Sequence, residues 1–421
     1  MSISQRSSVV GATAEPHEQD AHEQDGTRQI VKQHLDRTYL ARTLVRLGRV
    51  PTAVPMGSET LIEPDDPMLV HYVQHVLRPE LVDIGIYDLI DAGRNNLVVR
   101  VGEGSSGRSL LVQNYTPTQH HNLMPNPFDA RIANARDYGF DEPAVFAQGV
   151  SQNKGHQAVM LAVLRLFQQS GVTLRGRLYW AINNEGRSSH ACTDAILAAL
   201  DEQPQFAILQ NRTGLKIQLG NRGRLDVNVH VKGRLVHSST PELGVSAIDG
   251  ATEVINRLKR LQWSDRHPLL GARQAVVYKL QFAPLAPHTL PSDAYLTIDR
   301  RLLPGDDLAV ATEEIRAAIG DLGPYDVTVE PGVFMLPALI EPEHPGVQAL
   351  QSSHTAIRGE PTAAVYGQGT FDAGGPSSHG IPTVMYGASA GLWPDGVDFV
   401  PLAAVETEAA VLAHLILREL G

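Results

Sequence analysis

Short apolar runs and segments of helical periodicity alternate along much of the chain. Residues 109–115 (SLLVQNY) have the apolar character of a buried strand, and residues 154–169 (KGHQAVMLAVLRLFQQ) have that of a largely apolar helix. The alternation runs from about residue 80 to 215 and returns after about residue 333, ending in a helix predicted over residues 402–420. This pattern predicts an α/β fold with a mostly parallel central sheet.

A different pattern interrupts the first. Residues 225–231 (LDVNVHV) alternate between apolar and polar positions, as an antiparallel strand with one solvated face does. The elements predicted after it complete a β-α-β-β-α-β order, which is typical of a small α+β sandwich. We therefore predict a disordered tail over residues 1–27, a catalytic α/β domain in two parts over residues 28–217 and 333–421, and an inserted α+β domain over residues 218–332.

Charge and composition exclude several classes of protein. The 421 residues include 35 basic and 46 acidic side chains, and the net charge of -11 argues against nucleic acid or an anionic membrane as a partner. No apolar run reaches the roughly 18 residues of a membrane-spanning helix, and the N-terminus lacks the apolar region of a signal peptide. Cys192 is the only cysteine, which excludes an intrachain disulfide. We therefore expect a cytoplasmic protein.

Polar residues follow the predicted strands of the α/β pattern. Tyr115, Asn184, Glu185 and Asn211 each stand at or just beyond the end of a strand. Because binding sites in parallel sheets form beyond the carboxyl ends of the strands, we predict that these four side chains share one site.

Several ordered blocks of the sequence resemble the M20 metallopeptidase family of carboxypeptidases, deacetylases and desuccinylases. The resemblance covers residues 30–421 and is carried by NPF at 126–128, QNKG at 152–155, HSS and PELG at 237–244, DRRLLPG at 299–305, and DA and GIPT at 372–383. It implies that the inserted domain is a dimerisation (lid) domain, so that the protein is a homodimer or a higher homo-oligomer. It also implies that His237 stabilises developing negative charge in the partner's site. For Arg301 it implies contact with a substrate carboxylate, although an intradomain salt bridge remains an equal alternative.

The chain departs from this family at the metal ligands. The positions of the family's ligands are occupied here by Tyr115, Gln152, Glu185, Asn211 and either Pro394 or Asp395. Because so few carboxylates cannot offset the charge of two dications, we exclude a conventional dinuclear centre. The predicted cofactor is one labile divalent transition metal ion, Mn²⁺ first. It would be held by Glu185 and the amide oxygens of Gln152 and Asn211.

Asn184 occupies the position of the family's general base, and an asparagine cannot accept that proton. The loss removes about 10²–10⁴-fold in rate, so we expect an activated, non-peptide C–N bond as the target. Glu185 is then the nearby replacement base, and Tyr115, His120 and Arg301 are the candidate contacts to a small carboxylated aromatic substrate. The resemblance to a ligand-poor member of this family implies hydrolytic deamination of 5-nitroanthranilate as the first expectation. The alternatives are a catalytically inactive binding protein and an N-acyl amino acid deacylase with a rewired metal site.

Overall fold

The structure is a computed structural model that describes residues 18–54, 61–118, 124–185, 189–390 and 396–421. These residues form two compact units. The α/β unit comprises the chain up to Gly220 together with Leu339–Val365 and Gly375–Gly421, and the inserted unit comprises Asn221–Ala338 together with Tyr366–Gly374. The inserted unit therefore extends a few residues beyond the expected range at its C-terminal end and also includes a loop from the second part of the α/β sequence.

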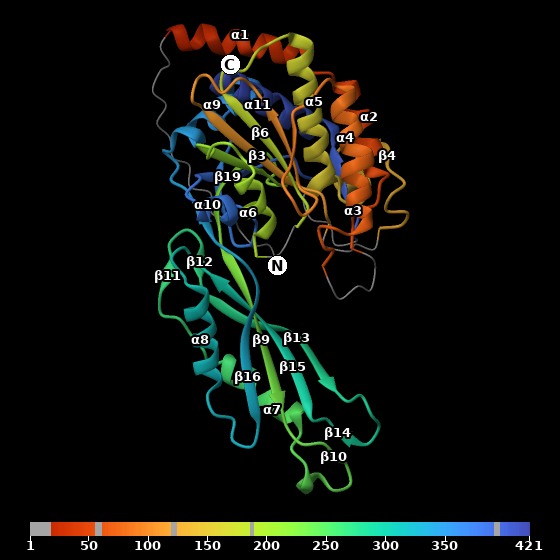
Figure 1. Cartoon of the computed structure of the whole chain (residues 1–421), viewed down its shortest axis with the longest axis vertical. Coiled ribbons are helices and arrows are strands. Elements are labelled where there is room, and N and C mark those ends of the chain that lie inside the picture. The colour runs from red at the N-terminus through yellow and green to blue at the C-terminus, as the bar shows by residue number, and fades with distance from the viewer. Residues whose placement is uncertain (1–17, 55–60, 119–123, 186–188, 391–395) are drawn as a thin grey trace. The chain divides into compact units, whose positions relative to one another are not determined.

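A nine-stranded sheet organises the described part of the α/β unit (Figure 1). Its middle strands run parallel, as the alternating pattern predicts, because β3 pairs in parallel with both β6 and β7, and β7 with β19. The strand order is β1-β2-β6-β3-β7-β19-β8-β17, with β18 beside β8. In that order the strands span Leu89–Asp91, Leu97–Val101, Arg177–Asn183, Ser109–Tyr115, Phe206–Gln210, Thr383–Tyr386, Ile217–Asn221, Ala338–Leu339 and Ala364–Gly367.

Helices cover both faces of this sheet, which explains why every residue of β3 and β7 is buried. One face is covered by α5 and α11, which pack against each other and against α1, α2 and α9. On the other face, Ile196 of α6 packs with Leu111 and Ala181 of the sheet, and α10 lies against α6. These helices span Glu18–His34 (α1), Arg37–Gly48 (α2), Gly155–Ser170 (α5), Ala191–Ala198 (α6), Pro345–Arg358 (α9), Gly374–Ser378 (α10) and Leu402–Leu420 (α11).

The predicted N-terminal tail needs a correction. Helix α1 begins at Glu18 and packs against α5 and α11, so residues 18–27 are helical rather than disordered. Asp36 lies just after α1 and is the N-cap of α2. Its carboxylate accepts the backbone N–H of Tyr39 at 2.8 Å. Residues 1–17 lie outside the described residues. None of the helices in the described ranges is long and apolar enough to cross a membrane.

Smaller elements complete the α/β unit. Helices α3 and α4 are joined by a π-helical turn, and they span Pro67–Tyr72 and Arg78–Asp83 with the turn at Val73–Leu77. A three-stranded sheet combines β4 (Arg131–Asn134), β5 (Pro143–Phe146) and β20 (Phe399–Pro401). The rings of Phe146 and Phe399 stack in it with centroids 5.0 Å apart. This sheet fixes the start of β20, and therefore the position of the preceding Asp398.

The inserted unit has the predicted β-α-β-β-α-β order. Its antiparallel sheet has the order β13-β15-β9-β16, and α7 and α8 cover one face of it through residues such as Val229, Val254, Ile298 and Ile315. These elements span Gly223–Lys232 (β9), Ala247–Leu258 (α7), Gln274–Ala283 (β13), Asp293–Leu302 (β15), Leu308–Ile319 (α8) and Asp326–Met335 (β16). Two short ladders pair β10 (Val236–His237) with β14 (Thr289–Leu290) and β11 (Arg266–His267) with β12 (Gly271–Ala272).

Candidate active site

Three neighbouring strands of the α/β unit end at the same edge of the sheet. Tyr115, the last residue of β3, pairs with Asn183, the last residue of β6. Asn184 and Glu185 follow directly, and Asn211 follows β7 on the other side of β3. The structure therefore brings together the strand-end residues that the sequence placed in one site.

A π-helical turn, Val150–Lys154, carries Gln152 to this edge just before α5. The side-chain amide of Asn153 donates to the carbonyl oxygens of Thr116 and Pro117, at 3.2 and 2.7 Å. These bonds hold the turn against the chain that leaves β3. The turn that contains Gln152 therefore lies beside the end of β3, and the role of Gln152 stays a prediction.

Tyr115 is buried, and its hydroxyl oxygen accepts a hydrogen bond from the side-chain amide of Gln113 at 3.4 Å. Gln157 also donates to the Tyr115 carbonyl oxygen at 3.1 Å. The role of Tyr115 as a hydrogen-bond donor to substrate stays a prediction.

Glu185 is buried at the N-terminal end of α6. One of its carboxylate oxygens accepts the backbone N–H of Cys192 at 2.6 Å, a position where the helix dipole favours negative charge. A hydrogen bond to Cys192 raises the pKa of Arg94, and the nearby charge of Glu185 raises it further. The Glu185 carboxylate is thus partly engaged by the protein itself.

Asn184 is fully buried, and its side-chain amide is hydrogen-bonded to the turn between β1 and β2. Its side chain donates to the carbonyl oxygen of Asn95 at 2.6 Å, and its backbone N–H donates to Asn96 at 3.0 Å. Asn95 has a positive φ of 58°, a conformation that its short polar side chain tolerates. These contacts make Asn184 a residue that positions the strand end, and its amide has no capacity to act as a base.

Asn211 begins a tightly held turn after β7. Its side-chain oxygen accepts the backbone N–H of Arg212 at 2.8 Å, and its own N–H donates to the carbonyl oxygen of Tyr386 at 3.2 Å. Thr213 accepts the N–H of Gly387 at 3.1 Å and donates to the carbonyl oxygen of Lys216 at 2.6 Å. The turn therefore presents Asn211 and Arg212 on a fixed backbone.

These donors set limits on a metal site. Within the described ranges, no group of three or more His, Cys, Asp or Glu side chains could hold a metal ion. A pair of divalent ions therefore does not fit the described residues. One carboxylate with two amide oxygens, from Glu185, Gln152 and Asn211, fits a single hard cation that is held weakly.

Buried charge at this edge comes from residues that the sequence reasoning missed. Lys154 is fully buried, donates to the carbonyl oxygen of Val50 and lies over the ring of Phe128, 5.2 Å from its centroid. Burial lowers the pKa of Lys154 to about 7, with the charge of Asp398 acting in the opposite direction. The only sequence signal was the charged residue inside the QNKG block, directly ahead of an apolar helix.

Asp398 and Arg212 form the rest of this charged group. The Asp398 carboxylate accepts the backbone N–H groups of Gly149 and Ser151, at 2.6 and 3.2 Å. Burial raises the pKa of Asp398, while the Ser151 and Gly149 hydrogen bonds and the charge of Arg212 act against that rise. Burial also lowers the pKa of Arg212. The Asp398 carboxylate is therefore close enough to Lys154 and Arg212 to act on the pKa of both.

A buried polar network links α11 to the strands and helix that carry the site residues. Glu408 of α11 is fully buried and pairs with the ring of His156 at 2.9 Å. It also accepts hydrogen bonds from the side chain of Gln210 and the backbone N–H of Ala388, both at 2.8 Å. This network fixes the end of β7 relative to α5 and α11.

The inserted unit contains two further predicted site residues. His237 is exposed at the end of β10, and its Nδ1 lies 2.8 Å from the hydroxyl oxygen of Ser239. Arg301 makes two 2.8 Å contacts with the Asp299 carboxylate and donates to Thr370 at 2.5 Å. The intradomain salt bridge is therefore present, which leaves the guanidinium charge of Arg301 largely neutralised. His120 and the alternative late-ligand positions, Pro394 and Asp395, lie outside the described residues.

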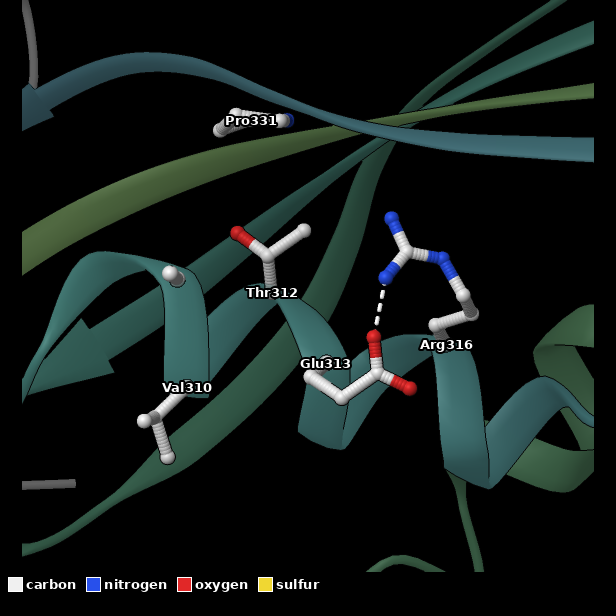
Figure 2. Close-up of a pocket in the computed structure, with 6 residues that line it drawn as sticks. Val310, Thr312, Glu313, Arg316 and Pro331 are labelled. Carbon is white, nitrogen blue, oxygen red and sulfur yellow. Dashed lines mark hydrogen bonds and ion pairs between the residues drawn. The ribbon is translucent and has the colours of Figure 1, made fainter.

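A hollow of about 470 Å³ on the inserted unit offers no comparable chemistry (Figure 2). It lies between α8 and β16 and is lined by residues such as Val310, Thr312 and Pro331. Its two charged groups, Glu313 and Arg316, form an ion pair with each other. The edge of the parallel sheet therefore remains the candidate active site.

Comparison with known proteins agrees with this architecture. Residues 219–327 match the peptidase dimerisation domain family. The chain is 26% identical over 285 residues to the uncharacterized protein YgeY of Escherichia coli K12, covering 61% of this chain and 70% of that protein. It is 28% identical over 171 residues to acetylornithine deacetylase of Proteus mirabilis, covering 40% and 42%.

The solved structures extend the similarity to about nine tenths of the chain. The M20 family metallo-carboxypeptidase Sso-CP2 from Sulfolobus solfataricus matches with a TM-score of 0.72 at 15% identity, covering 90% of this chain and 98% of that one. A tripeptidase from Staphylococcus aureus matches with a TM-score of 0.69 at 17% identity, covering 91% and 100%. The chain therefore has the fold of the M20 peptidases, and its residues 219–327 are a peptidase dimerisation domain.

Proposed function

We propose that this protein is a hydrolase that cleaves an activated, non-peptide C–N bond in a small carboxylated aromatic molecule. The deacetylase and the metallo-carboxypeptidase to which the chain is similar support C–N hydrolysis as the reaction class. The observation that carries the finer proposal is Asn184, whose amide is bonded to Asn95 where the resemblance requires a general base. Because this site lacks that base, the substrate itself has to supply the activation.

The proposed reaction is hydrolytic deamination of 5-nitroanthranilate to 5-nitrosalicylate and ammonia. The nitro group para to the amine withdraws electrons from the ring carbon that bears nitrogen. Water adds its oxygen to that carbon and gives one proton to Glu185, while negative charge passes into the ring and nitro group. Glu185 then returns that proton to the amine nitrogen, the electron pair of the ring re-forms the aromatic system, and the C–N bond breaks to release ammonia. Such a substrate requires less help from a protein base than an amide does.

Each candidate site residue has a proposed role in this reaction. Glu185 is the proton acceptor nearest the reacting water, and the Tyr115 hydroxyl donates a hydrogen bond to the substrate. Glu185, Gln152 and Asn211 would hold one divalent ion, Mn²⁺ first, and such an ion would supply a lowered pKa for bound water. Weak binding by neutral amides makes that ion labile until the substrate adds its own donors. His237 and His120 are proposed contacts to the substrate, and Arg301 is an alternative contact that its salt bridge with Asp299 disfavours.

Assembly into a homodimer or a larger homo-oligomer is part of the same proposal. The match to a peptidase dimerisation domain supports it. So does strand β13, an edge of its sheet, on which the exposed apolar side chains are Val276, Tyr278, Leu280 and Phe282. Exposed apolar edge strands favour association with another chain. In the dimer, His237 would act in the site of the partner subunit.

The test is ammonia release from 5-nitroanthranilate by the purified full chain, measured with added Mn²⁺ and with EDTA. We expect release that depends on the metal and is lost in Glu185→Gln, which keeps the size of the side chain and removes its charge. An acetylated amino acid such as N-acetylornithine serves as the amide substrate. Cleavage of that amide in preference to the aromatic amine would replace the proposal with a deacylase. Inertness towards both would replace it with a binding protein.

A further inference from the structure

The guanidinium of Arg212 lacks hydrogen-bond partners among the described residues of the candidate active site. Its side chain is half-buried, and the charge that acts on it is the carboxylate of Asp398. A desolvated cation without hydrogen-bond acceptors is unfavourable for folding, and sites that bind anions contain such groups.

The nearby carboxylate of Asp398 does not fill this role. One of its oxygens accepts the N–H of Gly149 and the other accepts the N–H of Ser151. Asp398 also lies close enough to Lys154 to act on its pKa, so its carboxylate is not reserved for Arg212. The N–H groups of the Arg212 guanidinium are therefore available to a bound anion.

The backbone around Arg212 is held rigidly, which suits a residue that orients a ligand. The Asn211 side-chain oxygen accepts the backbone N–H of Arg212, and the Thr213 hydroxyl accepts the backbone N–H of Gly387. A Cβ atom added at Gly387 would lie 2.4 Å from the carbonyl oxygen of Asn211, so the two segments are in direct backbone contact. A fixed turn lowers the entropy lost when the guanidinium binds a ligand.

We propose that Arg212 binds the carboxylate of the substrate through its forked N–H groups, at the edge of the sheet beside Asn211. The inference rests on the proposed function in that both concern the same site. It differs from the expectation for Arg301, whose fork is already engaged by Asp299. A guanidinium suits a planar carboxylate because it offers two parallel hydrogen bonds.

The experiment compares binding of two matched probes, anthranilate and its neutral carboxamide, by isothermal titration calorimetry with the full chain and Mn²⁺. We expect the wild-type protein to prefer anthranilate by about 10- to 100-fold, the usual worth of charged hydrogen bonds. Arg212→Gln removes the preference, and Arg212→Lys keeps a part of it. The matched control is Arg37→Gln, because Arg37 is exposed and lies on α2 of the same unit.

Three binding results overturn the inference. They are equal binding of both probes by the wild-type protein, no binding of anthranilate, and a preference that Arg212→Gln leaves intact while Arg301→Gln removes it. Thermal unfolding separates binding from folding, because removal of an unpaired buried cation in Arg212→Met should leave the melting temperature unchanged or raised. A clear fall in that temperature would give Arg212 a structural role and contradict the proposal.

The inference and the proposed function can fail separately. If ammonia is not released but carboxylate binding depends on Arg212, the reaction is wrong and the anion site stands. If ammonia is released and the preference for anthranilate does not depend on Arg212, the reaction stands and the anion site is wrong.

Discussion

Replacing Lys154 by methionine gives a direct test of the buried charge at the site. Lys154 has no exposed surface, and burial lowers its pKa from the ordinary value of 10.5 to about 7. Below pH 7 both the native and unfolded chains carry this proton, and the native state bears the full cost of a buried ammonium. Between pH 7 and 10.5 the native chain loses the proton while the unfolded chain keeps it. The native state therefore gains stability as the pH rises through this interval.

The size of the effect follows from these two pKa values. Each pH unit between them is worth about 1.4 kcal/mol, so the wild-type protein gains ~5 kcal/mol relative to Lys154→Met across the interval. The substitution also leaves the carbonyl oxygen of Val50 without its donor, at a cost of about 1–3 kcal/mol at every pH. We therefore expect the variant to be more stable at pH 6 and the wild-type protein to be more stable at pH 10.

The assay is urea unfolding followed by tryptophan fluorescence at pH values from 6 to 10, with Trp180 as a fully buried reporter. Lys32→Met, at an exposed position on α1, is the matched control, and its difference from the wild-type protein should stay flat with pH. Parallel stability curves for the wild-type protein and Lys154→Met would refute a lowered pKa for Lys154. The cation would then be solvated or fully compensated.

Three more predictions concern stability, assembly and metal. Glu408→Ala should lower the free energy of unfolding by about 3–5 kcal/mol because it leaves His156 and the other hydrogen-bond donors to Glu408 without an acceptor. Glu408→Gln should lower it less, and equal losses for the two variants in thermal unfolding would contradict this. Leu280→Lys should raise the dissociation constant of the dimer about tenfold or more in analytical ultracentrifugation, and an unchanged constant would remove β13 from the interface. Dialysis against EDTA should leave the melting temperature unchanged, whereas more than one tightly held ion per chain by elemental analysis would contradict the weak site.

The fold could be predicted because its local patterns are unambiguous. β3 spans Ser109–Tyr115, the whole of its predicted apolar run, since both faces of a central strand have to be buried. The order of elements in the inserted unit followed from the alternation in β9, where one face is solvated. In contrast, residues 18–27 are too polar for their periodicity to reveal a helix, because α1 is stabilised by packing against α11.

The site could be predicted only in part. Positions at strand ends identified Tyr115, Glu185 and Asn211, because parallel strands present their carboxyl ends at one edge. The direction in which a side chain points leaves no comparable pattern in the sequence. Nothing in the sequence indicates that Asn184 donates to Asn95, or that the Asp398 carboxylate is held by the backbone of the turn before α5. Both contacts join segments far apart along the chain.

Charge balance at the sheet edge gives the final argument about ligands. A pair of dications requires an excess of carboxylates, but the described residues here offer Glu185, which a helix N-terminus already engages, and Asp398, which Lys154 and Arg212 share. The two carboxylates are balanced by two basic groups, so little negative charge is left to offset the four positive charges of two dications in a poorly solvated place. A substrate carboxylate would add negative charge and also bring oxygen donors for one ion. The same residues therefore favour an anionic substrate and disfavour a metal centre that is complete without it.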